Sequence, residues 1–280
     1  MHTALRRTPV GSSLHQARLA ARVRSEAARL RGTASGGSGG PDSGGPGPGG
    51  PGSGGEDARL LAELIRRAMR WRLSPDERHW VRRIEAERRR LARSTEIVHR
   101  QEELPLTVAE VSRASQPWRG GRFLYAAVRA FRPSRGVELG TCLGVSAAYQ
   151  AAALGADGHG RLVTIEGYPD LAARARRFLA DVDLRNVEVV VGRFGQVLEP
   201  IVAAEPVDYA YVDGNHHEAP TLEYFSVVRR HCTKRTLLVF DDIRWSGGMW
   251  RAWNRIVAAD GVTAHADLGR LGLVIVRPTD

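Results

Sequence analysis

Acidic residues lie at the ends of short apolar runs in the second half of this 280-residue chain. They are Glu138, Glu166, Asp213 and the adjacent pair Asp241-Asp242. Carboxylates accept hydrogen bonds from ribose hydroxyls more strongly than neutral side chains do, and they are the oxygen ligands that Mg²⁺ prefers. A carboxylate buried at a strand end is costly without a partner, so acids at four such ends predict a ligand site.

A turn with two glycines follows the first of these acids. The stretch Glu138-Leu139-Gly140-Thr141-Cys142-Leu143-Gly144 leads directly into an alanine-rich segment. Gly140 can adopt positive φ and lets a ligand approach the backbone, while Gly144 allows close packing where the helix begins. The helix N-terminus offers free N–H groups to a polar ligand. The spacing matches neither G-x-G-x-x-G nor a P-loop, and alone it indicates only a strand–turn–helix connection.

The elements that must position these groups alternate between strand and helix patterns. Strands are predicted at 136–140, 161–166, 187–191, 207–213, 236–241, 262–267 and 271–277, and helices at 144–154, 169–182, 195–203, 217–231 and 248–259. This alternation predicts an α/β fold, a Rossmann-like doubly wound sheet with ligands beyond the carboxyl ends of its strands. Leu268-Gly269-Arg270 is too short for a crossover helix, so the last two strands should pair antiparallel.

Composition divides the chain into four segments. A basic tail covers 1–33 and carries a short helical pattern, a Gly/Ser/Pro linker expected to be disordered covers 34–55, a helical extension covers 56–132, and the α/β domain covers 133–280. Helices of the extension are expected over 56–72, from Ser74-Pro75 through Ile97, over 108–113 and over 122–130. They are expected to cap the sheet or to form the contact of a homodimer.

The net charge of +10 is concentrated near the N-terminus. Residues 1–33 carry seven arginines and one acid, whereas from residue 105 onward there are 21 basic and 19 acidic residues. The α/β domain is therefore not expected to bind nucleic acid. No apolar run is long enough to span a membrane, and the two cysteines, Cys142 and Cys232, suit a reducing, cytoplasmic location.

At these motifs the sequence resembles the class I S-adenosylmethionine-dependent methyltransferases, of the small-molecule O-methyltransferase type. The resemblance covers roughly residues 105–280. Its motifs are Glu138-Leu139-Gly140-Thr141-x-x-Gly144, Thr164-Ile165-Glu166, Val191-Gly192-Arg193-Phe194, Val212-Asp213-Gly214-Asn215-His216 and Val239-Phe240-Asp241-Asp242-Ile243. The family implies a seven-stranded sheet in the order 3-2-1-4-5-7-6 with the last strand antiparallel, S-adenosyl-L-methionine as cofactor, and a small-molecule hydroxyl as acceptor.

The resemblance also implies which residues hold the cofactor. They are Glu138, Gly140, Thr141, Gly144, Glu166, Arg193, Phe194 and Asp213. The glycine turn would hold the methionine part and Glu166 the ribose. Many relatives carry an acid at the position of Arg193, and a guanidinium cannot accept a hydrogen bond. Adenine contact would therefore rest on the backbone and on stacking with Phe194.

Methyl transfer to a hydroxyl requires an activated oxygen, and the sequence offers two means. Asp213, Asp241 and Asp242 are candidate ligands for Mg²⁺, which would lower the pKa of the acceptor hydroxyl. His216 or His217 is a candidate general base, with Asp213 beside it. The alternative structural roles are a loop cap for Asp241 and a helix cap or surface position for either histidine.

Other functions fit parts of the same pattern. An NAD(P)-dependent oxidoreductase would also use Glu166 for a ribose, but the third glycine of its fingerprint is missing. A non-catalytic cofactor-binding or RNA-associated protein would use the arginine-rich N-terminus. An amine N-methyltransferase is disfavoured because Asp-Gly-Asn-His, rather than Pro-Pro-aromatic, follows the fourth strand.

Overall fold

A seven-stranded sheet forms the centre of the computed structural model, which describes residues 25–26, 28–30, 53–70, 72–101, 104–158, 160–232 and 234–279. Its strands are β3 (Arg135–Leu139), β4 (Arg161–Glu166), β5 (Val187–Val191), β6 (Tyr209–Val212), β7 (Thr236–Phe240), β8 (Val262–Asp267) and β9 (Gly272–Val276). They lie in the order β5-β4-β3-β6-β7-β9-β8. With β3 counted as the first strand, this is the predicted order 3-2-1-4-5-7-6.

The direction of the strands also agrees with the prediction. Strands β3 to β7 pair parallel, and β9 pairs antiparallel with both β7 and β8. The short connection after β8 forces this last reversal because it leaves no room for a crossover helix. The carboxyl ends of the five parallel strands therefore meet along one edge of the sheet, which we call the rim.

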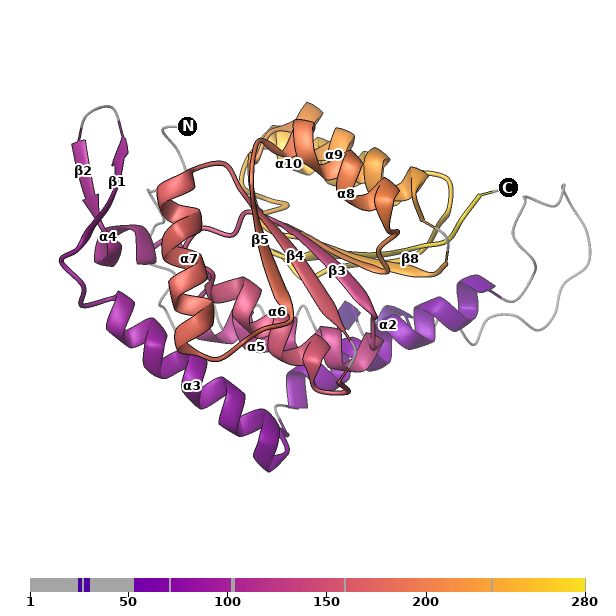
Figure 1. The fold of residues 1–280 in the computed structure, drawn as a ribbon. Coiled ribbons are helices and arrows are strands. Elements are labelled where there is room, and N and C mark those ends of the chain that lie inside the picture. Colours follow the sequence, from indigo (N-terminus) through magenta and orange to yellow (C-terminus); the bar gives the residue numbers. More distant parts are fainter. Residues whose placement is uncertain are drawn as a thin grey trace, which may run out of the picture.

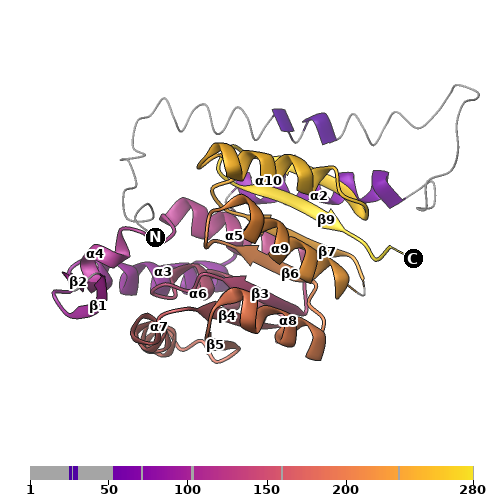
Figure 2. The ribbon, with the colours of Figure 1, turned by 90° about the horizontal axis from the view of Figure 1, so that it is seen from above.

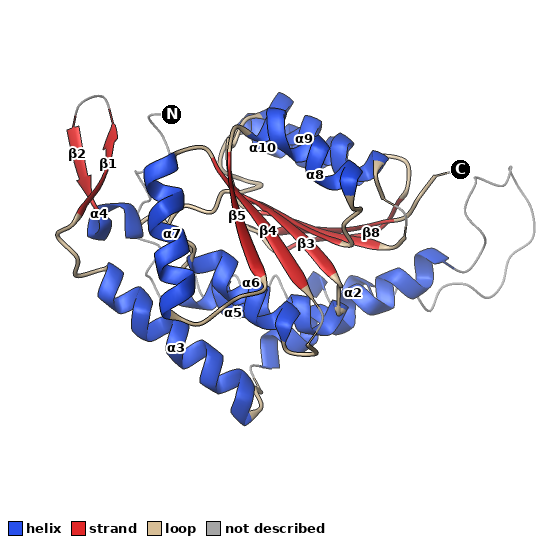
Figure 3. Cartoon of the chain, viewed as in Figure 1, coloured by secondary structure: helices blue, strands red, loops and turns tan. Residues whose placement is uncertain are grey.

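Helices connect the strands and cover both faces (Figures 1 and 3). They are α2 (Ser53–Arg70), α3 (Pro75–Leu91), α4 (Val108–Ser112), α5 (Trp118–Phe131), α6 (Val145–Gly155), α7 (Pro169–Asp181), α8 (Phe194–Ala204), α9 (Glu218–Arg230) and α10 (Gly247–Val257). Seen from above in Figure 2, α10, α9 and α8 lie side by side across one face. On the other face α5 packs between α2 and α6, α2 also lies against β8, and α3 packs on α6.

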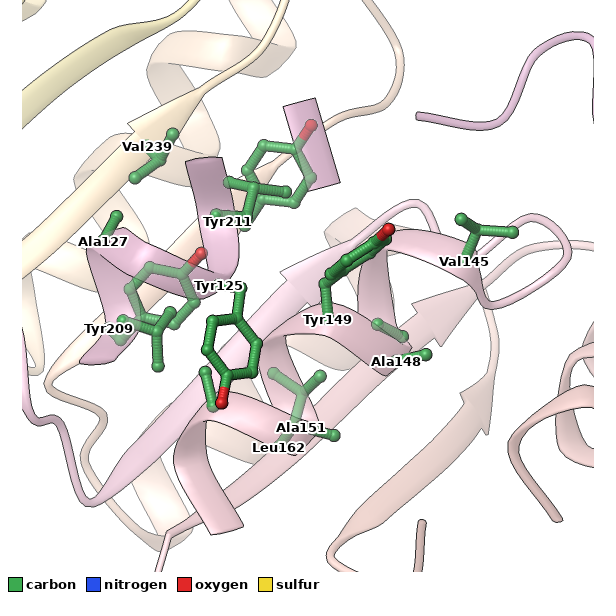
Figure 4. Packing of buried hydrophobic residues seen from close by; sticks show 14 of the residues in the cluster. Tyr125, Ala127, Val145, Ala148, Tyr149, Ala151, Leu162, Tyr209, Tyr211 and Val239 are labelled. Carbon is green, nitrogen blue, oxygen red and sulfur yellow. The ribbon is translucent and has the colours of Figure 1, made fainter. Parts of the chain in front are cut away.

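Alternation along each strand divides the buried residues between the two faces. On β6, Tyr209 and Tyr211 join the core beneath α5 and α6, whereas Ala210 and Val212 join the core beneath α8 to α10. A period of two is what a strand buried on both sides produces. Figure 4 shows Tyr209 and Tyr211 near Tyr125 and Ala127 of α5, with Tyr149 of α6 on the far side of Tyr125. This packing holds β6 and its rim residues rigidly in place.

The helical extension caps the sheet. Asp57 of α2 is fully buried, where it accepts hydrogen bonds from Arg277 Nε at 2.7 Å and from the hydroxyl of Thr263 at 2.6 Å. The described part of the basic tail is helical and docks on β8, since Arg29 donates to the carbonyl of His265 at 2.9 Å. The homodimer contact stays a prediction from the sequence.

The prediction was wrong at three boundaries of the extension; one is the start of α5, which begins at Trp118 rather than at 122. The helix that begins with the Ser74 capping box ends at Leu91, and Ile97 starts a hairpin of β1 (Ile97–Gln101) and β2 (Leu104–Thr107). Ile97, predicted to be on the apolar side of that helix, is 55% exposed. Helix α2 begins at Ser53, so the last residues of the predicted linker are helical; residues 34–52 lie outside the described part.

Within the described residues, no helix has the length and apolar character needed to cross a membrane.

Candidate active site

The glycine turn after β3 fits tightly against the rim of its two neighbouring strands. Gly140 has φ +108°, and a Cβ at this position would overlap the carbonyl oxygen of Asp213. The Gly140 N–H donates to the carbonyl of Ile165 at 3.0 Å, and the Asp213 N–H donates to the carbonyl of Leu139 at 2.9 Å. Only glycine permits this approach, so the turn is joined to the ends of both β4 and β6.

Glu138 lies behind this turn rather than in the open site. Its side chain is 0% exposed, and it accepts hydrogen bonds from Gln150 at 2.6 Å and from the hydroxyl of Thr164 at 2.5 Å. The hydroxyls of Thr141 and Thr164 are 2.6 Å apart, which extends the network to the turn. Glu138 and Thr141, both predicted to contact the cofactor, therefore fasten the turn to α6 and β4 in this structure.

Burial raises the pKa of Glu138 from its ordinary 4.5 to about 7, although hydrogen bonds from Thr164, Ser146 and Gln150 oppose the shift. Because the folded protein then holds a proton that the unfolded chain has released, the stability contributed by this group is present below pH 4.5 and is lost as the pH rises through about 7.

We expect Glu138→Gln to remove this pH dependence. The free energy of unfolding of the wild type, relative to that of the variant, should fall by on the order of 3 kcal/mol between about pH 4.5 and pH 8. Urea unfolding at several pH values measures both proteins. Parallel stability curves for the two proteins would show that Glu138 does not titrate in this range.

Glu166 ends β4 and is held at the rim by the backbone. One carboxylate oxygen accepts the N–H of Cys142 at 2.8 Å, and the other accepts the N–H of Tyr168 at 3.0 Å. Burial raises the pKa of Glu166, and these backbone hydrogen bonds oppose the shift. The carboxylate is thus fixed between the turn after β3 and the loop after β4. The sequence predicts that this carboxylate binds the ribose of the cofactor.

Phe194 and Arg193 lie at the next strand end. The Phe194 ring packs edge-on against Tyr224, with 5.6 Å between ring centroids, and a Cβ on Gly214 would collide with it. The Gly192 N–H donates to the carbonyl of Glu166 at 2.9 Å, so the loop after β5 lies next to the residue predicted to bind the ribose. Arg193 is exposed. The ring of Phe194 therefore borders the rim, while the guanidinium of Arg193 has no described role there.

Asp213 and His216 face each other in the loop after β6. His216 Nε2 is 3.7 Å from Asp213 Oδ1, and the His216 ring lies 6.4 Å from the ring of Trp245, measured between centroids. His216 is partly buried, whereas His217 is exposed at the N-cap position of α9. Of the two predicted base candidates, the structure brings only His216 to the carboxylate.

Asp241 does not have the surroundings of an open metal ligand. It is 0% exposed, and it accepts hydrogen bonds from the guanidinium of Arg270 at 2.6 Å and 2.5 Å, from Gln116 at 2.7 Å and from the backbone N–H of Asp242 at 2.8 Å. The Tyr211 hydroxyl lies 3.2 Å from Asp241 and 3.1 Å from Asp213. The described residues contain no group of three or more His, Cys, Asp or Glu side chains arranged to hold a metal ion.

The predicted set of Asp213, Asp241 and Asp242 therefore does not fit a divalent cation as it stands. The physical reason is that the guanidinium of Arg270 already lies between Asp241 and Asp242. Its Nε is 3.1 Å from a carboxylate oxygen of Asp242.

Three residues of this network were missed by sequence reasoning: Gln116, Tyr211 and Arg270. Gln116 lies in a loop with no motif, and Tyr211 looks like any core residue of a strand. The position of Arg270 could have been predicted from the sequence, because antiparallel pairing of the last strand with β7 puts Gly272 beside Phe240. The residue two positions before Gly272 then falls next to Asp241-Asp242.

Comparisons with known proteins agree with this geometry. A family model described as "Methyltransferase domain" matches residues 137–243. A catechol O-methyltransferase of Mycobacterium tuberculosis is 30% identical over 165 residues, which cover 59% of this chain and 71% of that protein. The range matched by the family model, residues 137–243, includes the glycine turn and the loops after β4, β6 and β7.

Two solved structures show the same fold. The O-methyltransferase TomG from Streptomyces achromogenes, in complex with SAM, has a TM-score of 0.50 at 24% identity and covers 59% of this chain and 82% of that chain. The SAH-bound methyltransferase PaMTH1 of Podospora anserina has a TM-score of 0.53 at 15% identity, covering 85% of this chain and 100% of that chain. At these identities the likeness supports the architecture alone.

Proposed function

The chain belongs to the class I S-adenosylmethionine-dependent O-methyltransferases, and we propose that it transfers a methyl group to a hydroxyl of a small molecule. The observation that carries this proposal is the contact between Gly140 and the carbonyl of Asp213. It joins the turn proposed to hold the methyl donor to the loop that bears His216. Donor and base candidates therefore open onto the same part of the rim.

The residues at the rim fit S-adenosylmethionine. Gly140 lets the turn close against the Asp213 carbonyl, and Glu166 presents a fixed carboxylate to the two hydroxyls of a ribose. Phe194 borders the position proposed for the adenine. When bound, S-adenosylmethionine supplies an electrophilic methyl group on a sulfonium, and the protein contributes mainly the orientation of donor and acceptor.

His216 is the proposed general base. A neutral imidazole can take the proton of an acceptor hydroxyl, and Asp213 would stabilise the imidazolium that results. Trp245, close to the His216 ring, offers an aromatic wall for an acceptor. The catechol named for the M. tuberculosis relative is a rational first acceptor to test. Mg²⁺ assistance is not part of this proposal, because Asp241 is saturated by hydrogen bonds within the protein.

We expect Glu166→Gln to weaken S-adenosylmethionine binding by about 10- to 100-fold, because one or two charge-assisted hydrogen bonds to the ribose are lost. In glutamine one of the two carboxylate oxygens becomes an NH₂ group, which would face the N–H of either Cys142 or Tyr168 and could not accept from it. Titration calorimetry measures the dissociation constants of the two proteins.

The matched control is Glu188→Gln on the neighbouring strand β5, where the side chain is exposed. This variant should bind the cofactor like the wild type. Wild-type protein that releases no heat and shows no thermal shift with S-adenosylmethionine would contradict the proposed function; equal affinity in Glu166→Gln would remove Glu166 from the site.

A further inference from the structure

We propose that the Arg270 guanidinium is a built-in counter-ion of Asp241 and Asp242, and that it takes the position a divalent cation would need between these carboxylates and Asp213. Given the proposed function, methyl transfer by this chain would then proceed without a divalent cation. The proposal concerns residues of this chain and follows from four features of the structure.

The first feature is the saturation of Asp241. Both of its oxygens accept from Arg270 in a bidentate arrangement, and Gln116 and the Asp242 backbone each add one hydrogen bond. A carboxylate has about four lone-pair sites. A metal ion could therefore bind Asp241 only by displacing donors that the fold has placed around a fully buried group.

The second feature is that backbone hydrogen bonds hold Arg270 next to the Asp241-Asp242 loop, in addition to the contacts of its side chain. The Ile243 N–H donates to the Arg270 carbonyl at 3.1 Å, which ties the turn before β9 to the Asp241-Asp242 loop. The Leu268 N–H donates to the carbonyl of Leu271 at 2.8 Å and closes the turn itself. The backbone of Arg270 is therefore held next to the Asp241-Asp242 loop by contacts that do not involve its side chain.

The third feature is charge. Burial lowers the pKa of Arg270, but the charges and hydrogen bonds of Asp241 and Asp242 outweigh burial and raise it. The guanidinium is thus cationic at every working pH, and its side chain is only 31% exposed. Two like charges a few ångströms apart in a partly buried site repel strongly, so a divalent cation is disfavoured while Arg270 is in place.

The fourth feature is the route from Arg270 to the reacting region. Gln116 donates to Asp241 and also to the Tyr211 hydroxyl, and that hydroxyl lies 3.1 Å from Asp213. Burial, together with Asp213 and Asp241, raises the pKa of Tyr211, so its hydroxyl stays protonated and donates. Arg270 is therefore a positioning residue: it fixes Asp241, which helps to orient the donors that hold Asp213 next to His216.

The test is Mn²⁺ binding to the full chain, followed by the electron paramagnetic resonance signal of free Mn²⁺. Wild type is expected to bind no Mn²⁺ at this cluster at concentrations up to about 1 mM. Arg270→Met should gain one Mn²⁺ per chain, since Asp241 and Asp242 would both be left without the guanidinium that pairs with them. Arg230→Met removes an exposed arginine paired with Glu199 and should behave as the wild type does.

One Mn²⁺ per wild-type chain that Asp241→Asn abolishes would overturn the proposal, and so would a folded Arg270→Met that gains no Mn²⁺. Circular dichroism establishes folding. If Arg270→Met does not fold, the proposal is tested by comparing Mn²⁺ binding to the wild type with Mn²⁺ binding to Asp241→Asn. Calorimetry with S-adenosylmethionine on the same wild-type sample keeps the two proposals separate: missing cofactor binding defeats the proposed function, whereas Mn²⁺ binding defeats only the role of Arg270.

Discussion

Replacing Gly140 by alanine is expected to abolish measurable binding of S-adenosylmethionine, with a loss of at least about 100-fold in affinity, and to destabilise the fold by roughly 3 kcal/mol or more. At φ +108° a Cβ is strained, and it would also overlap the carbonyl of Asp213. To make room, the turn after β3 must move away from β6, which separates the proposed donor site from the loop that bears His216. Calorimetry and urea unfolding measure the two effects.

Gly158 provides the control for Gly140. It also has positive φ, +86°, but nothing lies within 4 Å of an added Cβ. Gly158→Ala therefore carries the conformational strain without the collision, and should cost about 1–2 kcal/mol while leaving cofactor affinity unchanged. If the two alanine variants bind the cofactor equally well, the close approach to Asp213 does not shape the site.

The sheet could be predicted from the sequence because its central strands are buried on both faces. Runs such as Leu162-Val163-Thr164-Ile165 have few other stable arrangements, and the predicted strands 161–166 and 187–191 agree with β4 and β5 to the residue. Strand order needed the family resemblance, since alternation alone does not choose among doubly wound topologies.

Elements outside the sheet were harder to predict from the sequence, because the local apolar pattern there does not agree with the structure that forms. Ile97 continues the apolar spacing of α3, yet the helix ends at Leu91 and the chain turns into the hairpin β1–β2. That hairpin is held by contacts remote in sequence, including His99 with Asp170 at 2.8 Å. A pattern over neighbouring residues cannot report such contacts.

The candidate site was predictable in its acids but not in their partners. Strand-end carboxylates are visible in a sequence, and the structure brings Glu166, Asp213 and Asp241 to one rim. What each carboxylate can do depends on its donors. Gln116 lies 125 residues from Asp241, and Arg270 lies 29 residues away, so the Mg²⁺ prediction could not anticipate that Asp241 is already satisfied.

The largest effect on turnover is expected from His216→Ala, which should lower kcat by about 10²- to 10⁴-fold while leaving the affinity for S-adenosylmethionine unchanged. The imidazole is the partly buried base candidate beside Asp213, and a hydroxyl is a poor nucleophile until its proton is removed. Transfer of a labelled methyl group to catechol, or to an acceptor found by labelling a metabolite mixture, measures the loss.

His217 provides the matched control for His216, because it is a second imidazole one residue away in the sequence. His217 is exposed at the N-cap of α9, so His217→Ala should retain turnover within about two-fold. Solvent proton acceptors cannot replace His216 efficiently, because the base must lie within hydrogen-bond reach of the acceptor oxygen. Equal losses in the two variants would indicate a general disturbance of the loop, and full turnover in His216→Ala would assign the proton transfer to another group at the rim.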